Sequence, residues 1–193
     1  FDELSEEIRL HSTDNLEVQS EACEIAYVIY TSGSTGRAKG VAVSHDNLSV
    51  FLDWSDESFD ETEFQCVLAS TSVCFDLSIF EFLAPLSSGG SIALVDSILD
   101  LLDLNSTPSI SLINVVPSAV REVLRVGAIP KSVITVCSAG ERLNQETVEG
   151  IFANSDVQRV LDLYGPTEDT IYSTQAERRP GEPENIGRPL PNS

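Results

Sequence analysis

The sequence has no methionine, a single tryptophan and far fewer basic than acidic residues. Lys and Arg number 11 against 31 Asp and Glu, which gives a formal net charge of −20. An acidic chain has no general basic field, so we expect neither nucleic acid nor an anionic membrane as a partner. No apolar run approaches the roughly 20 residues of a membrane helix. We therefore expect a cytoplasmic location, and the lack of Met suggests an internal or processed piece of a longer protein.

The sequence also lacks the motifs that are typical of metal sites and of hydrolases. Cys23, Cys66, Cys74 and Cys137 are scattered, without a CxxC pair or a histidine cluster, which argues against a zinc site. The acidic run that follows Trp54 lacks the ligand order of an EF-hand. No serine stands in GxSxG, so a hydrolase nucleophile is weakly supported. The four cysteines are expected to be reduced and buried as small hydrophobic residues.

The order of apolar and polar residues predicts an α/β fold with a largely parallel sheet flanked by helices. After an acidic, irregular lead-in over 1–24, one domain is expected over 25–193. Strands are predicted at 24–30, 41–43, 64–69, 91–95, 110–116, 132–137 and 158–163. Helices are predicted after a cap at Ser44 or Asp46 and at 76–86, 98–104, 118–126 and 144–152. The remainder, 178–193, is expected to be an irregular connector.

What the sequence does have is a loop rich in glycine and hydroxyl groups, Tyr30 to Gly40, directly after an apolar strand. Its glycines allow backbone N–H groups to approach an anion, and Lys39 supplies a compact positive charge. It is not a Walker A loop, which would need glycine at Ala38 and a hydroxyl at Gly40. Two interpretations remain open: a polyphosphate site, or a polar turn between strands.

Ligands of open α/β sheets bind beyond the carboxyl ends of the strands. Three loops are predicted at that edge: Thr31 to Gly40, Ser138 to Glu141, and Tyr164 to Glu168. The sequence therefore predicts a shared site built from segments far apart in the chain.

Asp76 opens an apolar helix in the segment FDLSIFE, residues 75–81. An aspartate there can cap the helix. Among apolar neighbours it can instead bind a substrate ammonium group. Both interpretations remain open from these residues alone.

Four segments in this order resemble the adenylation domain of nonribosomal peptide synthetases, within the adenylate-forming superfamily. They are TSGSTGRAKG at 31–40, FDLSIFE at 75–81, YGPTE at 164–168 and NIGRPLPN at 185–192. The resemblance spans about 25–193 and implies part of the large N-terminal subdomain of such an enzyme. One departure is Ala38, where the family's phosphate loop usually carries proline; this should make the loop more flexible.

The resemblance implies that ATP and an amino acid give aminoacyl-AMP and pyrophosphate. Catalytic roles fall on Lys39, Thr167 and Glu168, with Glu168 holding Mg²⁺. Nucleotide contacts are implied for Thr31, Ser32, Gly33, Ser34, Thr35, Gly36, Lys39, Ala139, Gly140, Tyr164 and Thr167. Because the substrate carboxylate attacks the α-phosphorus without a protein nucleophile, catalysis is positioning and charge neutralisation.

The resemblance also implies an amino-acid pocket in which Asp76 pairs with the substrate ammonium. Its side-chain walls are implied to be Leu77, Phe80, Asn114, Cys137, Ala139, Leu163, Ile171 and Tyr172. None of these is charged, so a neutral substrate side chain is expected. Leu77, Phe80 and Tyr172 would fill enough volume to favour a small one such as alanine. An ordinary core is the alternative for the apolar members.

The implied partners are a carrier protein, whose phosphopantetheine thiol receives the aminoacyl group, and a condensation domain of the same synthetase. The family's adenylating unit is much longer than 193 residues, so the isolated piece is expected to bind ATP weakly and turn over little. Two alternative functions remain: an acyl- or aryl-CoA ligase of the same superfamily, which would not need Asp76, and a non-catalytic nucleotide-binding domain.

Overall fold

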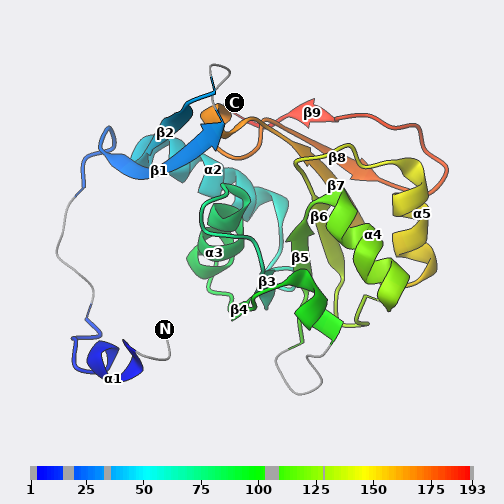
Figure 1. Cartoon of the computed structure of the whole chain (residues 1–193), viewed down its shortest axis with the longest axis horizontal. Helices are drawn as coiled ribbons and strands as arrows, with labels where there is room; N and C mark the ends of the chain where they lie inside the picture. The colour runs from blue at the N-terminus through cyan, green and yellow to red at the C-terminus, as the bar shows by residue number, and fades with distance from the viewer. Residues whose placement is uncertain (1–3, 15–19, 33–35, 103–108, 128, 192–193) are drawn as a thin grey trace.

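The computed structural model describes residues 4–14, 20–32, 36–102, 109–127 and 129–191. Over these ranges the chain forms a seven-stranded sheet with helices on both faces, and a two-stranded hairpin beside it (Figure 1). The α/β class predicted from the sequence is confirmed. The strands of the large sheet are β3 (Val67–Ala69), β4 (Ile92–Leu94), β5 (Leu112–Val115), β6 (Thr135–Ser138), β7 (Arg159–Tyr164), β8 (Thr174–Arg178) and β9 (Arg188–Pro189).

The strand order is β4-β3-β5-β6-β7-β8-β9. The first five are parallel to one another, whereas β8 pairs with β7, and β9 with β8, in the antiparallel sense. In the parallel part, Val115 is opposite Ser138, and Ser138 is opposite Asp162. The carboxyl ends of β5, β6 and β7 therefore lie at one edge.

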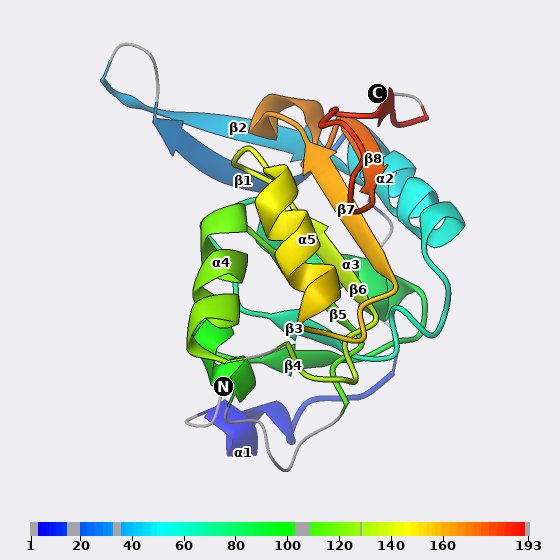
Figure 2. The same cartoon turned by 90° about the vertical axis from the view of Figure 1, so that its right-hand side faces the viewer.

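Helices cover both faces of the sheet, with α4 and α5 in front of it and α3 behind it in Figure 2. This arrangement explains why β3, β5 and β6 are buried along their whole length. The helices are α1 (Ser5–Ile8), α2 (His45–Ser58), α3 (Leu77–Ser87), α4 (Pro117–Val126) and α5 (Gln145–Ala153), with short 3₁₀ turns η2 (Ile98–Leu102) and η3 (Thr167–Asp169).

Successive side chains of each strand enter different cores because they point to opposite faces of the sheet. Val67 packs in the cluster under α2 and α3, and its neighbour Leu68 packs in the cluster under α4 and α5. In the same way, Cys137 packs in the cluster under α2 and α3, and Val136 packs in the cluster under α4 and α5. The α2/α3 cluster also contains most of the residues predicted for the amino-acid pocket, so this face positions the site.

The prediction of a phosphate loop at the edge of the parallel sheet was wrong in its architecture. Residues 25–32 and 38–44 form strands β1 (Ile25–Ser32) and β2 (Ala38–Ser44), which pair as an antiparallel sheet of their own. Thr31 is opposite Lys39, and Ser32 is opposite Ala38. The ladder thus continues through both ends of the expected loop, because these residues can still exchange backbone hydrogen bonds.

Two further predictions about irregular segments need correction. The lead-in contains the one-turn helix α1, and the predicted connector contains β9, while β8 was not predicted at all. The alternation in β8 is weak, and its partners in β7 lie 10 to 18 residues earlier in the chain, so only pairing with β7 defines it. None of the described helices is long and apolar enough to cross a membrane.

Candidate active site

The hairpin reaches the edge of the large sheet through Lys39. Its Nζ lies 3.9 Å from Oε1 of Glu168, in the turn that follows β7. Both side chains are well exposed, so the pair adds little to stability. Their exposure also leaves both groups accessible to an anion and its metal ion. The structure therefore brings together two residues that sequence reasoning assigned to one site.

The predicted phosphate contacts are only partly described. The Thr31 hydroxyl donates to the carbonyl of Lys39 over 3.5 Å, across the hairpin. Gly36 has φ of +78°. Ser32 ends β1 and is exposed. Gly33, Ser34 and Thr35 lie outside the described residues.

A pocket of about 530 Å³ opens between the loops after β6 and β7. That volume is typical of small-molecule sites. Gly140, Leu163 and Tyr164, three of the predicted site residues, line it, and the Tyr164 side chain is exposed. Gly140 has φ of +80°, which a residue with a side chain rarely adopts. Ala139, which was also predicted for the adenine site, is buried and immediately precedes Gly140 in the chain.

Sequence reasoning missed the buried wall of this pocket, the Asp162–Arg178 ion pair. Arg178 Nη1 donates to Asp162 Oδ2 over 2.6 Å and to the Leu143 carbonyl over 3.1 Å. Burial raises the pKa of Asp162, and the guanidinium opposes that rise. No local signal could have found the pair, because β7 and β8 join it through antiparallel pairing.

A strap, residues 184–186, also lines the pocket, and the sequence predicted no role for it in the site. Glu184 accepts hydrogen bonds from Arg142 Nε over 2.8 Å and from the Gln145 backbone N–H over 3.1 Å. Hydrogen bonding from Arg142 lowers the pKa of Glu184, so it remains a carboxylate at neutral pH. These contacts hold Asn185 and Ile186 against the pocket.

Asp76 is 5% exposed and does not cap α3, because its side chain makes no capping hydrogen bond. The capping alternative is therefore wrong. Among the described residues, no hydrogen bond or ion pair to the Asp76 carboxylate is found. Tyr27 is close enough that burial and the Asp76 charge together raise its pKa to about 12. A nearly buried carboxylate without a cation is an unusual arrangement in a folded protein.

The eight residues predicted to line the amino-acid pocket are brought together, but as tightly packed core. Tyr172 donates its hydroxyl to Asn114 Oδ1 over 2.9 Å, and Asn114 Nδ2 donates to the Leu77 carbonyl over 3.5 Å. The rings of Phe80 and Tyr172 pack with centroids 5.8 Å apart. Each of the eight is at most 3% exposed: Leu77, Phe80, Asn114, Cys137, Ala139, Leu163, Ile171 and Tyr172.

Glu81, which sequence reasoning did not single out, is fully buried beneath the segment that leads to Asp76. Its Oε2 accepts from the backbone N–H of Ser70 over 2.9 Å and of Thr71 over 3.0 Å, and the Thr71 hydroxyl donates to Oε1. Burial raises its pKa to about 7 despite these bonds. A lone carboxylate on an apolar helix face was the available signal.

The metal prediction rests on Glu168 alone. Among the described residues, no group of three or more His, Cys, Asp or Glu side chains could hold a metal ion. Mg²⁺ is commonly bound by one or two carboxylates together with substrate phosphates and water. An exposed Glu168 beside Lys39 fits that kind of site, in which the nucleotide supplies the other ligands.

The family model for AMP-binding enzymes matches residues 2–193. The chain is 48% identical over 172 residues to a linear gramicidin synthase of Brevibacillus parabrevis. It is 45% identical over 178 residues to the AMB antimetabolite synthetase AmbB of Pseudomonas aeruginosa. These alignments cover 88% and 89% of the chain but only 3% and 14% of the two relatives, so the chain spans a small part of their length.

Two solved structures share the fold. The adenylation domain AlmE of Vibrio cholerae, in complex with glycyl-adenosine-5'-phosphate, matches with a TM-score of 0.81 and 26% identity, covering 90% of this chain and 35% of that one. A four-domain nonribosomal peptide synthetase bound to AMP and glycine matches with a TM-score of 0.73 and 28% identity, covering 86% and 13%.

Proposed function

Because the chain belongs to the AMP-binding enzyme family, we propose that it is part of a ligase that activates an amino acid as aminoacyl-AMP. The environment of Asp76 is the observation that favours an amino acid as the substrate. Its carboxylate is nearly buried at the start of α3, without a cation among the described residues. A substrate ammonium would supply the missing charge, whereas a fatty or aryl acid would leave the carboxylate unpaired.

The adenine and phosphates would occupy the edge between the hairpin and the large sheet. Tyr164 and the backbone of Ala139 and Gly140 would hold the base in the 530 Å³ pocket. Thr167 would contact the α-phosphate. The β- and γ-phosphates would be held by Thr31, Ser32, Gly33, Ser34, Thr35, Gly36 and Lys39.

Glu168 would hold Mg²⁺ beside Lys39, and the metal would neutralise charge on the phosphates. This chain then supplies orientation and a fixed positive charge, which are the main needs of a reaction without a protein nucleophile. The AlmE structure holds a glycyl adenylate. That ligand is the glycine analogue of the product proposed here.

A small neutral amino acid is the proposed substrate. The predicted pocket walls are uncharged, and Phe80 and Tyr172 already pack against one another with no charged group between them. The Asn114 amide accepts from the Tyr172 hydroxyl and donates to the Leu77 carbonyl, so both ends of this polar side chain already have partners within the protein. Alanine is the candidate to test first.

We also propose the partners of a peptide synthetase: a carrier protein whose phosphopantetheine thiol receives the aminoacyl group, and a condensation domain. Support comes from the relatives, which are named as gramicidin and antimetabolite synthetases. As the chain spans only 3% to 14% of their length, the activity belongs to the longer polypeptide. We propose 25–193 as the part of the adenylation domain that this chain contributes.

Amino-acid-dependent exchange of pyrophosphate into ATP by the intact polypeptide tests the proposal. Glycine, alanine, serine, valine and phenylalanine form the amino-acid panel, with fatty and aryl acids as rivals. We expect exchange with alanine or glycine and none with the acids that lack an ammonium. Exchange with fatty or aryl acids alone would favour a CoA ligase.

The Asp76→Asn variant isolates the charge, since asparagine has nearly the same shape. We expect kcat/KM for the amino acid to fall at least a hundredfold, the loss of one buried ion pair to the substrate being about 3 kcal/mol. Asp53→Asn, an exposed change on α2, is the matched control and should leave exchange unchanged. Equal activity of both variants would reject the role of Asp76.

A further inference from the structure

The connection between β7 and β8 contains two consecutive residues in the left-handed region of backbone space. Thr170 has φ of 60° and ψ of 69°, and Ile171 has φ of 74°. Both side chains are β-branched, for which positive φ is a genuine outlier. Such strain persists only where surrounding contacts enforce it, and it concentrates at functional sites.

Hydrogen bonds within the segment hold the backbone in this conformation. The backbone N–H of Tyr172 donates to the Thr170 carbonyl over 2.9 Å, which makes Ile171 the centre of a γ-turn with positive φ, the rarer of the two forms. The Ser173 N–H donates to the Tyr164 carbonyl over 2.7 Å and closes the segment at its base. The Ser173 hydroxyl donates to the Asp169 carboxylate.

Gly165 lies in direct contact with the backbone of this turn. A Cβ at Gly165 would lie 2.6 Å from Tyr172 Cα and 2.7 Å from the Ile171 carbonyl oxygen. The backbone that leaves β7 is therefore in contact with the backbone that enters β8. Segment 165–172 is closed upon itself, and it has little freedom to shift one end without the other.

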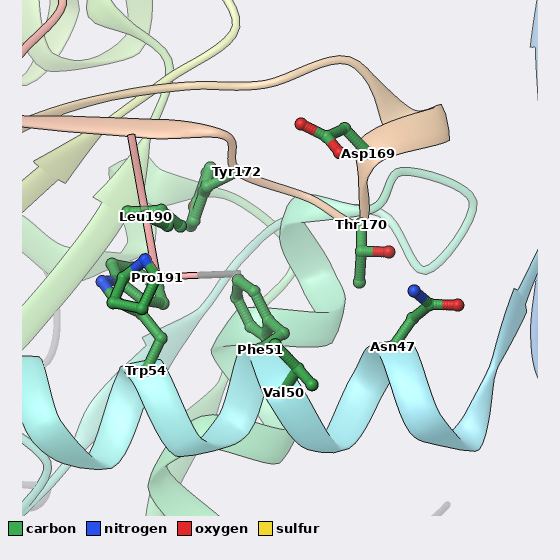
Figure 3. A pocket seen from close by; sticks show the side chains of 9 residues that line it. All are labelled: Asn47, Val50, Phe51, Trp54, Asp169, Thr170, Tyr172, Leu190 and Pro191. Carbon is green, nitrogen blue, oxygen red and sulfur yellow. The ribbon is translucent and has the colours of Figure 1, made fainter. Parts of the chain in front are cut away.

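The two ends of the turn belong to different parts of the proposed site. On one side lie Thr167 and Glu168, joined to the turn by the hydrogen bond from Thr170 N–H to the Thr167 carbonyl, 3.3 Å. On the other side Ile171 and Tyr172 enter the core. Figure 3 shows Asp169 and Thr170 above α2, with Tyr172 turned towards Phe51 and Trp54.

The Tyr172 side chain is fixed in the core by aromatic packing and by one hydrogen bond. Its ring packs against Phe51 at 5.9 Å, Trp54 at 6.0 Å and Phe80 at 5.8 Å between centroids. Its hydroxyl donates to Asn114. Displacement of Tyr172 by an ill-fitting ligand therefore has to be taken up by the adjacent γ-turn.

We propose that the strained turn at Thr170–Ile171 couples the fit of the substrate side chain to the position of Thr167 and Glu168. Thr170 is then a positioning residue: its stiff backbone transmits small shifts of Ile171 and Tyr172 to the catalytic segment. An ill-fitting amino acid is rejected in the chemical step, through misplacement of Glu168, as well as in binding. This inference rests on the proposed function.

The variants that test it change the backbone at Thr170 and little else. The Thr170 side chain is partly exposed and, within the described part of the chain, its hydroxyl makes no hydrogen bond. Thr170→Gly makes the left-handed conformation unstrained but flexible, and Thr170→Asn makes it tolerable without the flexibility of glycine. The two variants separate the stiffness of the turn from the identity of the side chain.

Pyrophosphate exchange by the intact polypeptide is measured with the preferred amino acid and with one that has an extra methylene, such as 2-aminobutyrate beside alanine. In the wild type we expect the preference to lie mainly in kcat. In Thr170→Gly the kcat preference should fall about tenfold, with each KM within about threefold of wild type. Thr170→Asn should keep the wild-type preference, and thermal melting verifies that both variants fold.

Three results would overturn the inference alone: a wild-type preference confined to KM, an unchanged kcat preference in Thr170→Gly, or an equal loss in Thr170→Asn. The first of these needs no variant, so the inference stays falsifiable if Thr170→Gly does not fold. Absence of exchange with every amino acid in the wild type would overturn the proposed function itself, and the coupling with it.

Discussion

Lys39 and Glu168 lie 129 positions apart in the chain, yet Lys39 Nζ is 3.9 Å from Glu168 Oε1. The first belongs to a hairpin that pairs with no strand of the large sheet, and the second follows strand β7 of that sheet. Their meeting joins the phosphate-binding segment to the metal-binding segment of the proposed site.

Lys39→Met and Glu168→Gln should separate function from stability. Because both side chains are exposed, either change should alter the free energy of unfolding by less than about 0.5 kcal/mol. Each should lower kcat/KM in pyrophosphate exchange by a hundredfold or more, since loss of one positioned charge in such a site costs about 3 kcal/mol. The charge-swapped double variant, Lys39→Glu with Glu168→Lys, should stay inactive; recovered exchange would show that the two groups serve only each other.

Glu81 should make stability fall as pH rises. Its folded pKa, about 7, is above the ordinary value of 4.5, so the unfolded chain ionises first. The stabilising effect is complete below about pH 4.5 and is lost progressively up to about pH 7, a total of about 3 kcal/mol. Urea unfolding of the chain and of Glu81→Gln between pH 4 and 8 tests this.

The Gln variant has no proton to exchange at this position. Its stability relative to the wild type should therefore improve with rising pH across that window, by an amount of the same order. A difference between the two proteins that stays constant from pH 4 to 8 would contradict the assignment. Other carboxylates cancel in the comparison, because both proteins contain them.

Gly165→Ala should destabilise the chain strongly. The added methyl would meet the backbone of Tyr172 and Ile171 at 2.6 to 2.7 Å, and backbone cannot move aside as a flexible side chain can. We expect a loss of about 2 to 3 kcal/mol in urea unfolding. Gly150→Ala in α5 is the matched control, since its methyl meets only the Leu124 side chain at 3.3 Å and alanine favours a helix. Similar losses in both variants would contradict a special role for Gly165.

Glu184→Gln should weaken nucleotide binding without changing amino-acid selectivity. Its carboxylate holds the strap against Arg142 and the Gln145 backbone, and the neutral amide would keep only part of these bonds. We expect KM for ATP in exchange to rise about tenfold, with KM for the amino acid within twofold. Glu182→Gln, exposed just before the strap and with no side-chain hydrogen bond in the described structure, should behave as wild type. A rise in both KM values would show general damage instead.

Much of the secondary structure was predictable from the sequence, because it depends on local patterns. The apolar runs that became β5, β6 and β7 lie close to their predicted places, and Ser44 caps α2 as one of two expected residues. The hairpin was predicted less well: backbone pairing extends beyond the apolar residues into Thr31 and Lys39. Side-chain pattern carries no signal for such an extension.

The local order of residues by itself determined the four motif segments and hence the family, since each segment needs only adjacent residues. The tertiary structure decided which distant groups meet: Lys39 with Glu168, Asp162 with Arg178, and Arg142 with Glu184. It also decided the backbone of Ile171, whose positive φ runs against its own preference. The burial of Tyr172 and the contact with Gly165 outweigh that preference, and both depend on chain packing that no short segment can specify.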